Sequence, residues 1–251
     1  MIDLHSHVLA GLDDGAADLD EAVAICRAAA ADGIEILAAT PHVRDDFPTT
    51  PEQMESALDA LRAAADGIVR LVPGGEIALE QLERPLDELR RFGLGGSDSY
   101  LLVETPYIGW PLGIADALFR LRSAGIVPVL AHPERNPDVQ HRPEILEPLV
   151  AAGTLVQVTA ASVDGRLGGA ARRCVRALLE RRLAHLVASD AHSPRVRAIG
   201  MRAAAEAVGD EFLARWLTYE VPRAIVDGSP LPARPESRPR RFHGLRRALS
   251  R

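Results

Sequence analysis

Two histidines separated by one residue, His5 and His7, directly follow a short apolar segment at the start of the chain. Residues i and i+2 of an extended chain point to the same side, so both imidazoles can face one metal ion. Asp13 and Asp14 lie in a glycine-flanked turn, and either carboxylate can reach back toward the same place. Histidine with carboxylate is a ligand set suited to Zn, Mn or Fe, so this stretch predicts part of a metal site.

Other histidines and carboxylates occur where later apolar segments end. With the first pair, the candidate metal ligands are His5, His7, Asp14, His42, Glu76, Glu104, His132, Asp190 and His192. These side chains exceed what one or two tetrahedral ions require, and they suit two or three ions bridged by carboxylate and water. Asp13 remains open as an alternative to Asp14.

Seven short apolar segments, each followed by a helical pattern, predict an α/β fold with parallel strands and right-handed crossovers. The segments are 1–4, 34–40, 68–72, 100–103, 126–131, 155–158 and 186–188. A closed barrel brings the carboxyl ends of its strands to one face, whereas an open sheet spreads them along a line. We therefore expect a distorted seven-stranded (β/α) TIM-like barrel. The helices include one over 79–91 with a break at Pro85 and one over 143–151.

The composition narrows the class of protein. The 251 residues carry a net charge of −6, which argues against a nucleic-acid binder, and no apolar run is long enough to span a membrane. The start of the chain has no signal-peptide pattern. Cys26 and Cys174 lie in helical patterns and are expected to be buried thiols in a reducing compartment. All basic residues other than histidine are arginine.

The motifs around these side chains resemble a known family. They are His5-Ser6-His7, the turn 11–15, Thr40-Pro41-His42, Glu76, residues 103–106, residues 131–135 and Ser189-Asp190-Ala191-His192. Together they are similar to the polymerase-and-histidinol-phosphatase (PHP) superfamily, and within it to the bacterial manganese-dependent protein tyrosine phosphatases of the CpsB/CapC type. The resemblance covers about the first 228 residues, which we take as the phosphatase domain, 1–228.

The resemblance implies the PHP fold and a site for two to three ions, with Mn expected and Fe or Zn as alternatives. It implies three metal positions, formed by His5, His7, Glu76 and Asp190; by Glu76, Glu104 and His132; and by Asp14, His42 and His192.

A phosphomonoester dianion needs a nucleophile and positive charge on the phosphoryl oxygens. Metal ions can supply hydroxide near neutral pH and neutralise those oxygens. Guanidinium groups bind the remaining oxygens well, and Arg135 and Arg197, shortly after His132 and His192, are the candidate catalytic residues for this role. The resemblance supports both assignments and implies hydrolysis of phosphotyrosine.

Other classes of protein fit the sequence less well than a metal-dependent tyrosine phosphatase. A cysteine-based phosphatase needs an arginine six residues after the thiolate, and that position holds Asp32 after Cys26 and Glu180 after Cys174. A small-molecule phosphatase of the histidinol-phosphate kind is the main alternative. A metal-dependent amidohydrolase and a non-catalytic scaffold are less favoured.

The segment 229–251 differs from the rest, because it holds four prolines and seven arginines against one glutamate. We expect a flexible, disordered basic tail that could make weak contact with a membrane surface. By the resemblance, the partner is a phosphotyrosine protein, the tail of a bacterial tyrosine kinase of polysaccharide export. We also expect a cytoplasmic location, because the thiols are expected to be reduced and no signal-peptide pattern is seen. Both a monomer and an oligomer are compatible with the sequence.

Overall fold

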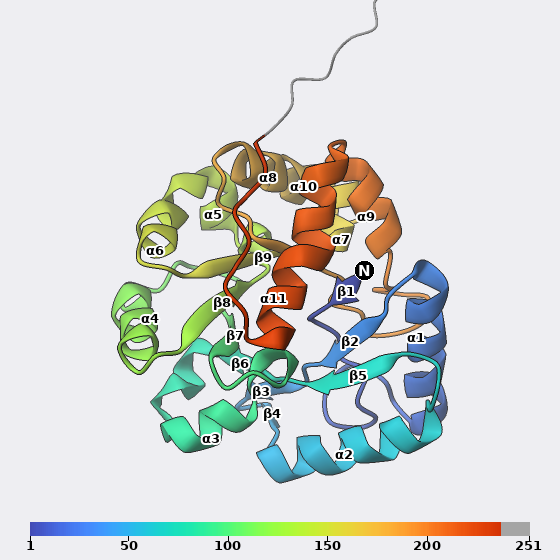
Figure 1. Ribbon diagram of the computed structural model, residues 1–251. Coiled ribbons are helices and arrows are strands. Elements are labelled where there is room, and N and C mark those ends of the chain that lie inside the picture. Colours follow the sequence, from blue (N-terminus) through green and yellow to red (C-terminus); the bar gives the residue numbers. More distant parts are fainter. Residues whose placement is uncertain (237–251) are drawn as a thin grey trace, which may run out of the picture.

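The computed structural model describes residues 1–236 and places short strands at the centre of the molecule (Figure 1). Within these residues the strands are β1 Ile2–Asp3, β2 Ile36–Ala39, β3 His42–Arg44, β4 Phe47–Pro48, β5 Arg70–Pro73, β6 Glu76–Ala78, β7 Tyr100–Glu104, β8 Val127–Ala131, β9 Leu155–Thr159 and β10 Leu186–Ala188. All the strand pairs are parallel except β3 with β4. The α/β class with parallel strands is therefore confirmed.

The strands form two sheets, one with the order β1-β2-β5 and one with the order β10-β9-β8-β7-β6-β3-β4. Two predicted strands are each followed by a second short strand, so β2 and β5 pair in one sheet while β3 and β6 pair in the other. The predicted set of seven strands was wrong in this respect, and it also omitted the antiparallel strand β4.

Hydrogen bonds link the segments that directly follow β1 and β10, which are edge strands of the two sheets. Ser6 and Ala191 form an isolated parallel bridge. The backbone N–H of Asp190 donates to the carbonyl of His5 at 2.9 Å, and that of His7 donates to Ala191 at 2.8 Å. The first His-x-His stretch therefore lies directly beside the stretch that holds Asp190 and His192.

Helices surround the strands on the outside of the molecule (Figure 1). In the described residues they are α1 Leu19–Asp32, α2 Pro51–Ala64, α3 Leu86–Arg91, α4 Ile114–Ser123, α5 Pro137–His141, α6 Glu147–Ala151, α7 Ala160–Asp164, α8 Gly169–Glu180, α9 Met201–Val208, α10 Glu211–Arg215 and α11 Val221–Asp227. Single turns of other helix types are η1 Leu79–Glu83, η2 Leu94–Gly96, η3 Pro133–Arg135, η4 Pro143–Leu146 and the π-helical η5 Trp216–Glu220.

The ends of the first helices follow from the sequence. The Asp18 side chain accepts a hydrogen bond from the backbone of Glu21 at the start of α1, and Gly33 ends that helix at φ 88°. Thr50 and Gln53 form a capping box at the start of α2. The predicted break at Pro85 is confirmed as the boundary between η1 and α3, whereas the single helix predicted over 143–151 is divided into η4 and α6.

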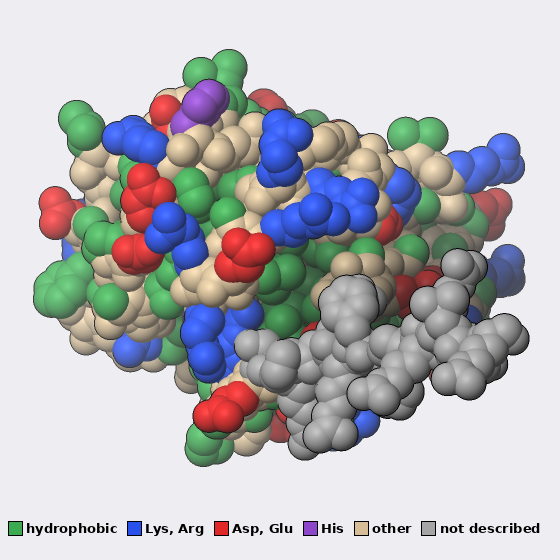
Figure 2. All heavy atoms as spheres, turned by 90° about the horizontal axis from the view of Figure 1, so that it is seen from above, with side chains coloured by type: hydrophobic (Ala, Val, Ile, Leu, Met, Phe, Trp, Pro, Cys, Tyr) green, Lys and Arg blue, Asp and Glu red, His purple; other side chains and the backbone are tan. Residues whose placement is uncertain are grey.

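Both cysteines are free and buried, as expected, and burial raises the pKa of Cys26 to about 11 and that of Cys174 to about 12. None of the helices in the described part of the chain is long and apolar enough to cross a membrane. On the face seen in Figure 2, arginine and carboxylate side chains are interspersed with exposed hydrophobic groups.

The segment that follows α11 lies against the body of the protein as far as it is described. The Trp216 indole N–H donates to the carbonyl of Pro232 at 3.0 Å. The Arg234 guanidinium donates to the carbonyls of Ala184 and Leu179 at 2.8 and 2.9 Å. The predicted flexible tail spans 229–251, and its larger part, 237–251, lies outside the described residues.

Candidate metal centre

The nine predicted ligands come together at the ends of the strands, from segments that are as far apart in the chain as His5 and His192. Eight of them are buried, and the Asp14 side chain is 41% exposed. Three overlapping groups of side chains are close enough to hold metal ions. They are His5, His7, Glu76 and Asp190; His42, Glu76 and Glu104; and His7, Asp14, His42 and His192.

The first group is the most deeply buried. The Nε2 atoms of His5 and His7 lie 3.3 and 3.2 Å from Glu76 Oε2, and 3.2 and 3.1 Å from Asp190 Oδ1. The two Nε2 atoms are 3.2 Å apart. Both imidazoles therefore point at one small volume, as their spacing in an extended segment predicts.

Glu76 also connects the first group to the second. Its Oε1 atom lies 2.7 Å from His132 Nε2, and its Oε2 atom lies 2.9 Å from His42 Nδ1. Glu104 Oε2 is 3.6 Å from the same His42 nitrogen. Glu76 therefore contacts residues of more than one group, and His42, which the resemblance implies for the third position, also lies beside Glu76.

The third group lies at the solvent-exposed side of the centre. Asp14 Oδ1 is 3.1 Å from His192 Nε2 and 3.5 Å from His42 Nε2. The ring of His192 stacks on that of His7, with centroids 3.9 Å apart. This arrangement brings together the three side chains of the third predicted position.

The alternative between Asp13 and Asp14 has a clear geometric answer. Asp13 Oδ2 lies 2.6 Å from His7 Nδ1 and accepts from the backbone N–H of His42 at 2.9 Å, while Oδ1 accepts from Gly15 at 2.9 Å. Asp13 therefore orients the His7 ring from behind and leaves Asp14 free to face an ion. The neighbouring imidazole helps to lower the pKa of Asp13 to about 2, although burial opposes this shift.

Gln157 contacts the outward nitrogen of His5, as Asp13 does that of His7, and this role was not predicted from the sequence. Its side-chain oxygen lies 3.0 Å from His5 Nδ1. A single glutamine inside a buried strand carries no motif, so only the three-dimensional structure reveals this contact. Because the outward ring nitrogens of both histidines have polar partners, their Nε2 atoms are directed to the centre.

Strained backbone is concentrated at this site. Four described residues other than glycine have positive φ, and three belong to the centre: His132 at 33°, Asp190 at 53° and Arg197 at 53°. L-residues adopt these angles at an energetic cost, which persists only where the surrounding structure fixes the backbone. The strain is consistent with side chains held in position for function.

The polar atoms of the centre suit divalent cations. Several polar atoms of the centre approach one another closely, yet five buried ones form no hydrogen bond of acceptable geometry within the described residues: His42 Nδ1, Glu76 Oε2, Glu104 Oε1, Asp190 Oδ1 and His192 Nε2. Such atoms are costly to bury unpaired, and coordination to a metal ion would satisfy them. Oxygen and imidazole nitrogen are both ligands of Mn, Fe and Zn.

The close packing of imidazoles and carboxylates shifts pKa values in the centre in both directions. Burial and the neighbouring His7 lower the pKa of His192 to about 3. Burial of His7 acts in the same direction, but the carboxylates around it, Asp13 above all, outweigh burial and raise the pKa of His7 well above its usual value. Burial opposes ionisation of Glu76, but the surrounding imidazoles outweigh it and hold the pKa of Glu76 well below its usual value. Burial and the charge of Glu76 raise the pKa of Glu104.

Both predicted arginines lie beside the centre. One Arg135 nitrogen is 2.5 Å from Asp190 Oδ2 and donates to Thr159 Oγ1 at 2.9 Å. Arg197 reaches Asp190 Oδ2 at 3.1 Å and Asp14 Oδ2 at 3.2 Å. Both guanidiniums also line a cavity of about 490 Å³ next to the centre.

Two further side chains at the centre were not predicted. Arg44 lies 3.4 Å from Glu104 Oε2, with its guanidinium over the Phe47 ring. Tyr107 is stacked parallel to His132, with centroids 6.4 Å apart. Both come from segments just after predicted strands, but a single arginine or tyrosine there is not distinctive.

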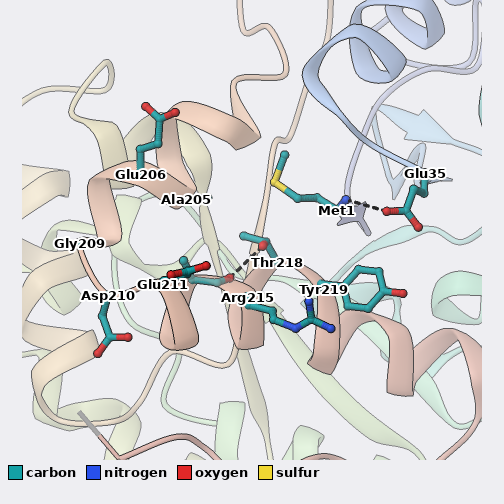
Figure 3. Close-up of a pocket in the computed structure, with 11 residues that line it drawn as sticks. Met1, Glu35, Ala205, Glu206, Gly209, Asp210, Glu211, Arg215, Thr218 and Tyr219 are labelled. Carbon is teal, nitrogen blue, oxygen red and sulfur yellow. Dashed lines mark hydrogen bonds and ion pairs between the residues drawn. The ribbon is translucent and has the colours of Figure 1, made fainter. Parts of the chain in front are cut away.

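A second cavity, of about 800 Å³, lies away from this chemistry. Met1, Glu35 and residues of α9, α10 and η5 line it (Figure 3). It contains none of the nine ligands and no histidine. The candidate catalytic chemistry is therefore located at the strand ends.

Comparisons with known proteins identify the family. A family model described as "Capsular polysaccharide synthesis, CpsB/CapC" matches residues 1–225. Tyrosine-protein phosphatase YwqE of Bacillus subtilis is 33% identical over 217 residues, which are 84% of this chain and 85% of the relative. Putative tyrosine-protein phosphatase CapC of Staphylococcus aureus is 31% identical over 199 residues, 77% of each chain.

A solved structure is similar over nearly the whole chain. It is described as "Crystal structures of YwqE from Bacillus subtilis and CpsB from Streptococcus pneumoniae, unique metal-dependent tyrosine phosphatases". The TM-score is 0.83 at 31% identity, and the match covers 95% of this chain and 100% of the other.

Proposed function

The chain belongs to the CpsB/CapC family of capsular polysaccharide synthesis, and from this premise we propose that it is a metal-dependent protein-tyrosine phosphatase. The observation that carries the proposal is the convergence of nine imidazole and carboxylate side chains beside two guanidinium groups. Relatives named tyrosine-protein phosphatases favour this activity over a small-molecule phosphatase, an amidohydrolase or a scaffold.

The nine residues would hold two to three ions, with Mn as the proposed metal and Fe or Zn as alternatives. The close approach of His5, His7, Glu76 and Asp190 supports a first position. Glu76 with His132 and Glu104 is proposed for a second position, and Asp14 with His42 and His192 for a third. When bound, the ions would offset negative charge on the phosphoryl oxygens and lower the pKa of water enough to provide hydroxide as the nucleophile.

Arg135 and Arg197 are proposed to bind the phosphoryl oxygens that do not face the ions. Each guanidinium already meets a carboxylate oxygen at the edge of the centre, a geometry that phosphate oxygens can share. The two arginines would offset negative charge on those phosphoryl oxygens. A tyrosine side chain leaves more readily than an alkyl alcohol because its pKa is near 10.

We further propose that the two sheets form a distorted seven-stranded barrel of the PHP type over residues 1–228. This proposal is supported by the parallel pairing of strands within each sheet and by the Ser6–Ala191 bridge, which joins the segments that follow β1 and β10. A cytoplasmic location, a kinase tail as partner, and contact of residues 229–251 with a membrane surface remain proposals from the resemblance and the arginine content.

A substrate panel tests the proposed activity. The protein is assayed with added Mn, Fe or Zn on a phosphotyrosine peptide, a phosphoserine peptide and histidinol phosphate. We expect metal-dependent hydrolysis with preference for phosphotyrosine, and loss of turnover in His42→Ala and His192→Ala with the fold intact by circular dichroism. Preference for histidinol phosphate would establish the alternative, and full turnover of both variants would remove the third metal position.

A further inference from the structure

The cavity beside the metal centre contains more positive charge than one phosphate requires. Its walls include four arginines and, within the described residues, a single carboxylate: Arg135, Arg166, Arg195, Arg197 and Asp190. Arg135 and Arg197 are paired with Asp190 and have a proposed role. Arg166 and Arg195 have no proposed role at the phosphate site.

Arg195 is available to bind an anion. It is exposed, and its guanidinium makes no hydrogen bond or ion pair with any of residues 1–236, since only its backbone N–H is engaged, by Ser193. It lies two residues before Arg197, in the loop between His192 and α9. The loop that brings one arginine to the proposed phosphate site therefore presents a second one to the same cavity.

Arg166 is held in place on the opposite loop. Its Nε atom donates to Asp164 at 2.7 Å, and its NH1 atom donates to the carbonyl of Ala198 at 3.3 Å. These contacts fix the side chain against the loop that carries Arg195. A guanidinium held in this way loses less conformational entropy when it binds a ligand.

The cavity also has apolar walls. Leu167 and Val196 are 45% and 74% exposed, and both line it, next to Arg166 and Arg195 in the sequence. A volume of about 490 Å³ can accept side chains of a peptide in addition to a phosphate group. The lining therefore suits a ligand with both anionic and apolar parts.

We propose that Arg195, supported by Arg166, forms a second anion subsite for the peptide whose phosphotyrosine binds at Arg135 and Arg197. The anion is a carboxylate or a second phosphate on that peptide. This inference rests on the proposed function and adds a source of substrate specificity. Asp190 and Asp14 offset the charges of Arg135 and Arg197, whereas no carboxylate of residues 1–236 pairs with Arg195.

The test uses four substrates and the full-length protein loaded with Mn. Three are phosphotyrosine peptides with neutral neighbours, with glutamates, or with a second phosphotyrosine, and the fourth is p-nitrophenyl phosphate, which has no neighbouring residues. Arg195→Gln and Arg166→Gln are compared with Arg27→Gln, which removes the same charge from an exposed position of α1 outside the cavity.

We expect the unmodified protein to prefer the anionic peptides in kcat/KM, and Arg195→Gln to lower that preference by about three- to tenfold. Turnover of p-nitrophenyl phosphate should stay within about twofold, and Arg27→Gln should change nothing. The anionic peptide with the larger loss identifies carboxylate or phosphate as the anion. An unchanged preference, or equal losses on all four substrates, would overturn the subsite. Absence of hydrolysis of every phosphotyrosine substrate by the unmodified protein would instead reject the proposed function.

Discussion

Asp190 joins the two halves of the candidate site through one carboxylate group. Its Oδ1 atom faces the imidazoles of His5 and His7, while its Oδ2 atom faces the guanidiniums of Arg135 and Arg197. The backbone of this residue has a positive φ of 53°, an uncommon conformation for an L-residue. The proposed metal and phosphate positions would therefore both depend on the Asp190 side chain.

Arg135→Gln tests whether Arg135 binds the phosphate group without also being needed for metal binding. The variant keeps a polar side chain but loses the charge and the paired donors, so kcat/KM for a phosphotyrosine peptide should fall by about 100-fold or more. Metal content, measured by mass spectrometry after dialysis, should match that of the unmodified protein. A loss of bound metal would mean that Arg135 holds Asp190 in place and would contradict its role as a phosphate ligand.

Asp13 and Asp14 should respond differently to the same change. Asp13→Asn removes the carboxylate that orients His7, so metal affinity should fall by about 10- to 100-fold while activity returns at saturating Mn. Asp14→Asn removes a proposed ligand and should leave activity low at any Mn concentration. Titration of activity with Mn distinguishes the two, and identical curves would contradict the assignment.

Site residues could be predicted from the sequence where the residue type itself indicates metal binding. Histidines and acids immediately after apolar segments are unusual, so the nine candidates could be chosen from the sequence. The choice between Asp13 and Asp14 could not be made, because both lie in one turn and only side-chain direction separates them. Gln157 gave no signal, since its role comes from a contact across 152 positions.

At the scale of elements, the positions of the main strands follow from buried apolar runs, but their interruptions do not. β2 and β3 are separated at Thr40-Pro41, and the carbonyl of Pro41 accepts from Glu76 at 3.0 Å. β5 and β6 are separated at Gly74-Gly75. Because of these breaks, β2 and β5 pair in one sheet while β3 and β6 pair in the other. This pairing joins segments far apart in the chain, so the local sequence does not predict it.

Gly75→Ala tests the tight packing at the second break. A Cβ atom at Gly75 would lie 2.7 Å from Cδ1 and 3.0 Å from Cβ of Phe92, a fully buried ring. We expect the free energy of unfolding to fall by about 1–3 kcal/mol in a denaturant titration. Gly113→Ala is the matched control, because a Cβ there meets open space. Equal stability of the two variants would show that the break is not closely packed.

At the scale of the whole molecule, the C-terminal segment is attached next to the sheet that carries the site. His185 accepts from the backbone N–H of Val156 at 3.1 Å, just before β10. Its ring lies 6.3 Å from that of Trp216, and the Arg234 guanidinium covers the same indole. Residues from β9, η5 and the last described segment therefore surround one partly buried imidazole.

This arrangement predicts how stability depends on pH. Burial, with the charge of Arg234, lowers the pKa of His185 to about 4, compared with 6.5 for the unperturbed side chain. Between these values the unfolded chain binds more protons, so this contribution to stability is complete above pH 6.5 and decreases as the pH falls toward 4. From pH 7.5 to 5 the loss amounts to about 2 kcal/mol.

His185→Gln should therefore lose about 2 kcal/mol less stability than the unmodified protein over the same interval, because glutamine does not titrate. Unfolding by urea at pH 7.5 and at pH 5 gives the comparison, with His141→Gln as a control at an exposed histidine. The measured quantity is the change in the free energy of unfolding between the two pH values. Titration of the metal centre contributes equally to this change in all three proteins and therefore cancels when they are compared. If His185→Gln and His141→Gln showed the same decrease as the unmodified protein, the His185 imidazole would not link the C-terminal segment to acid stability.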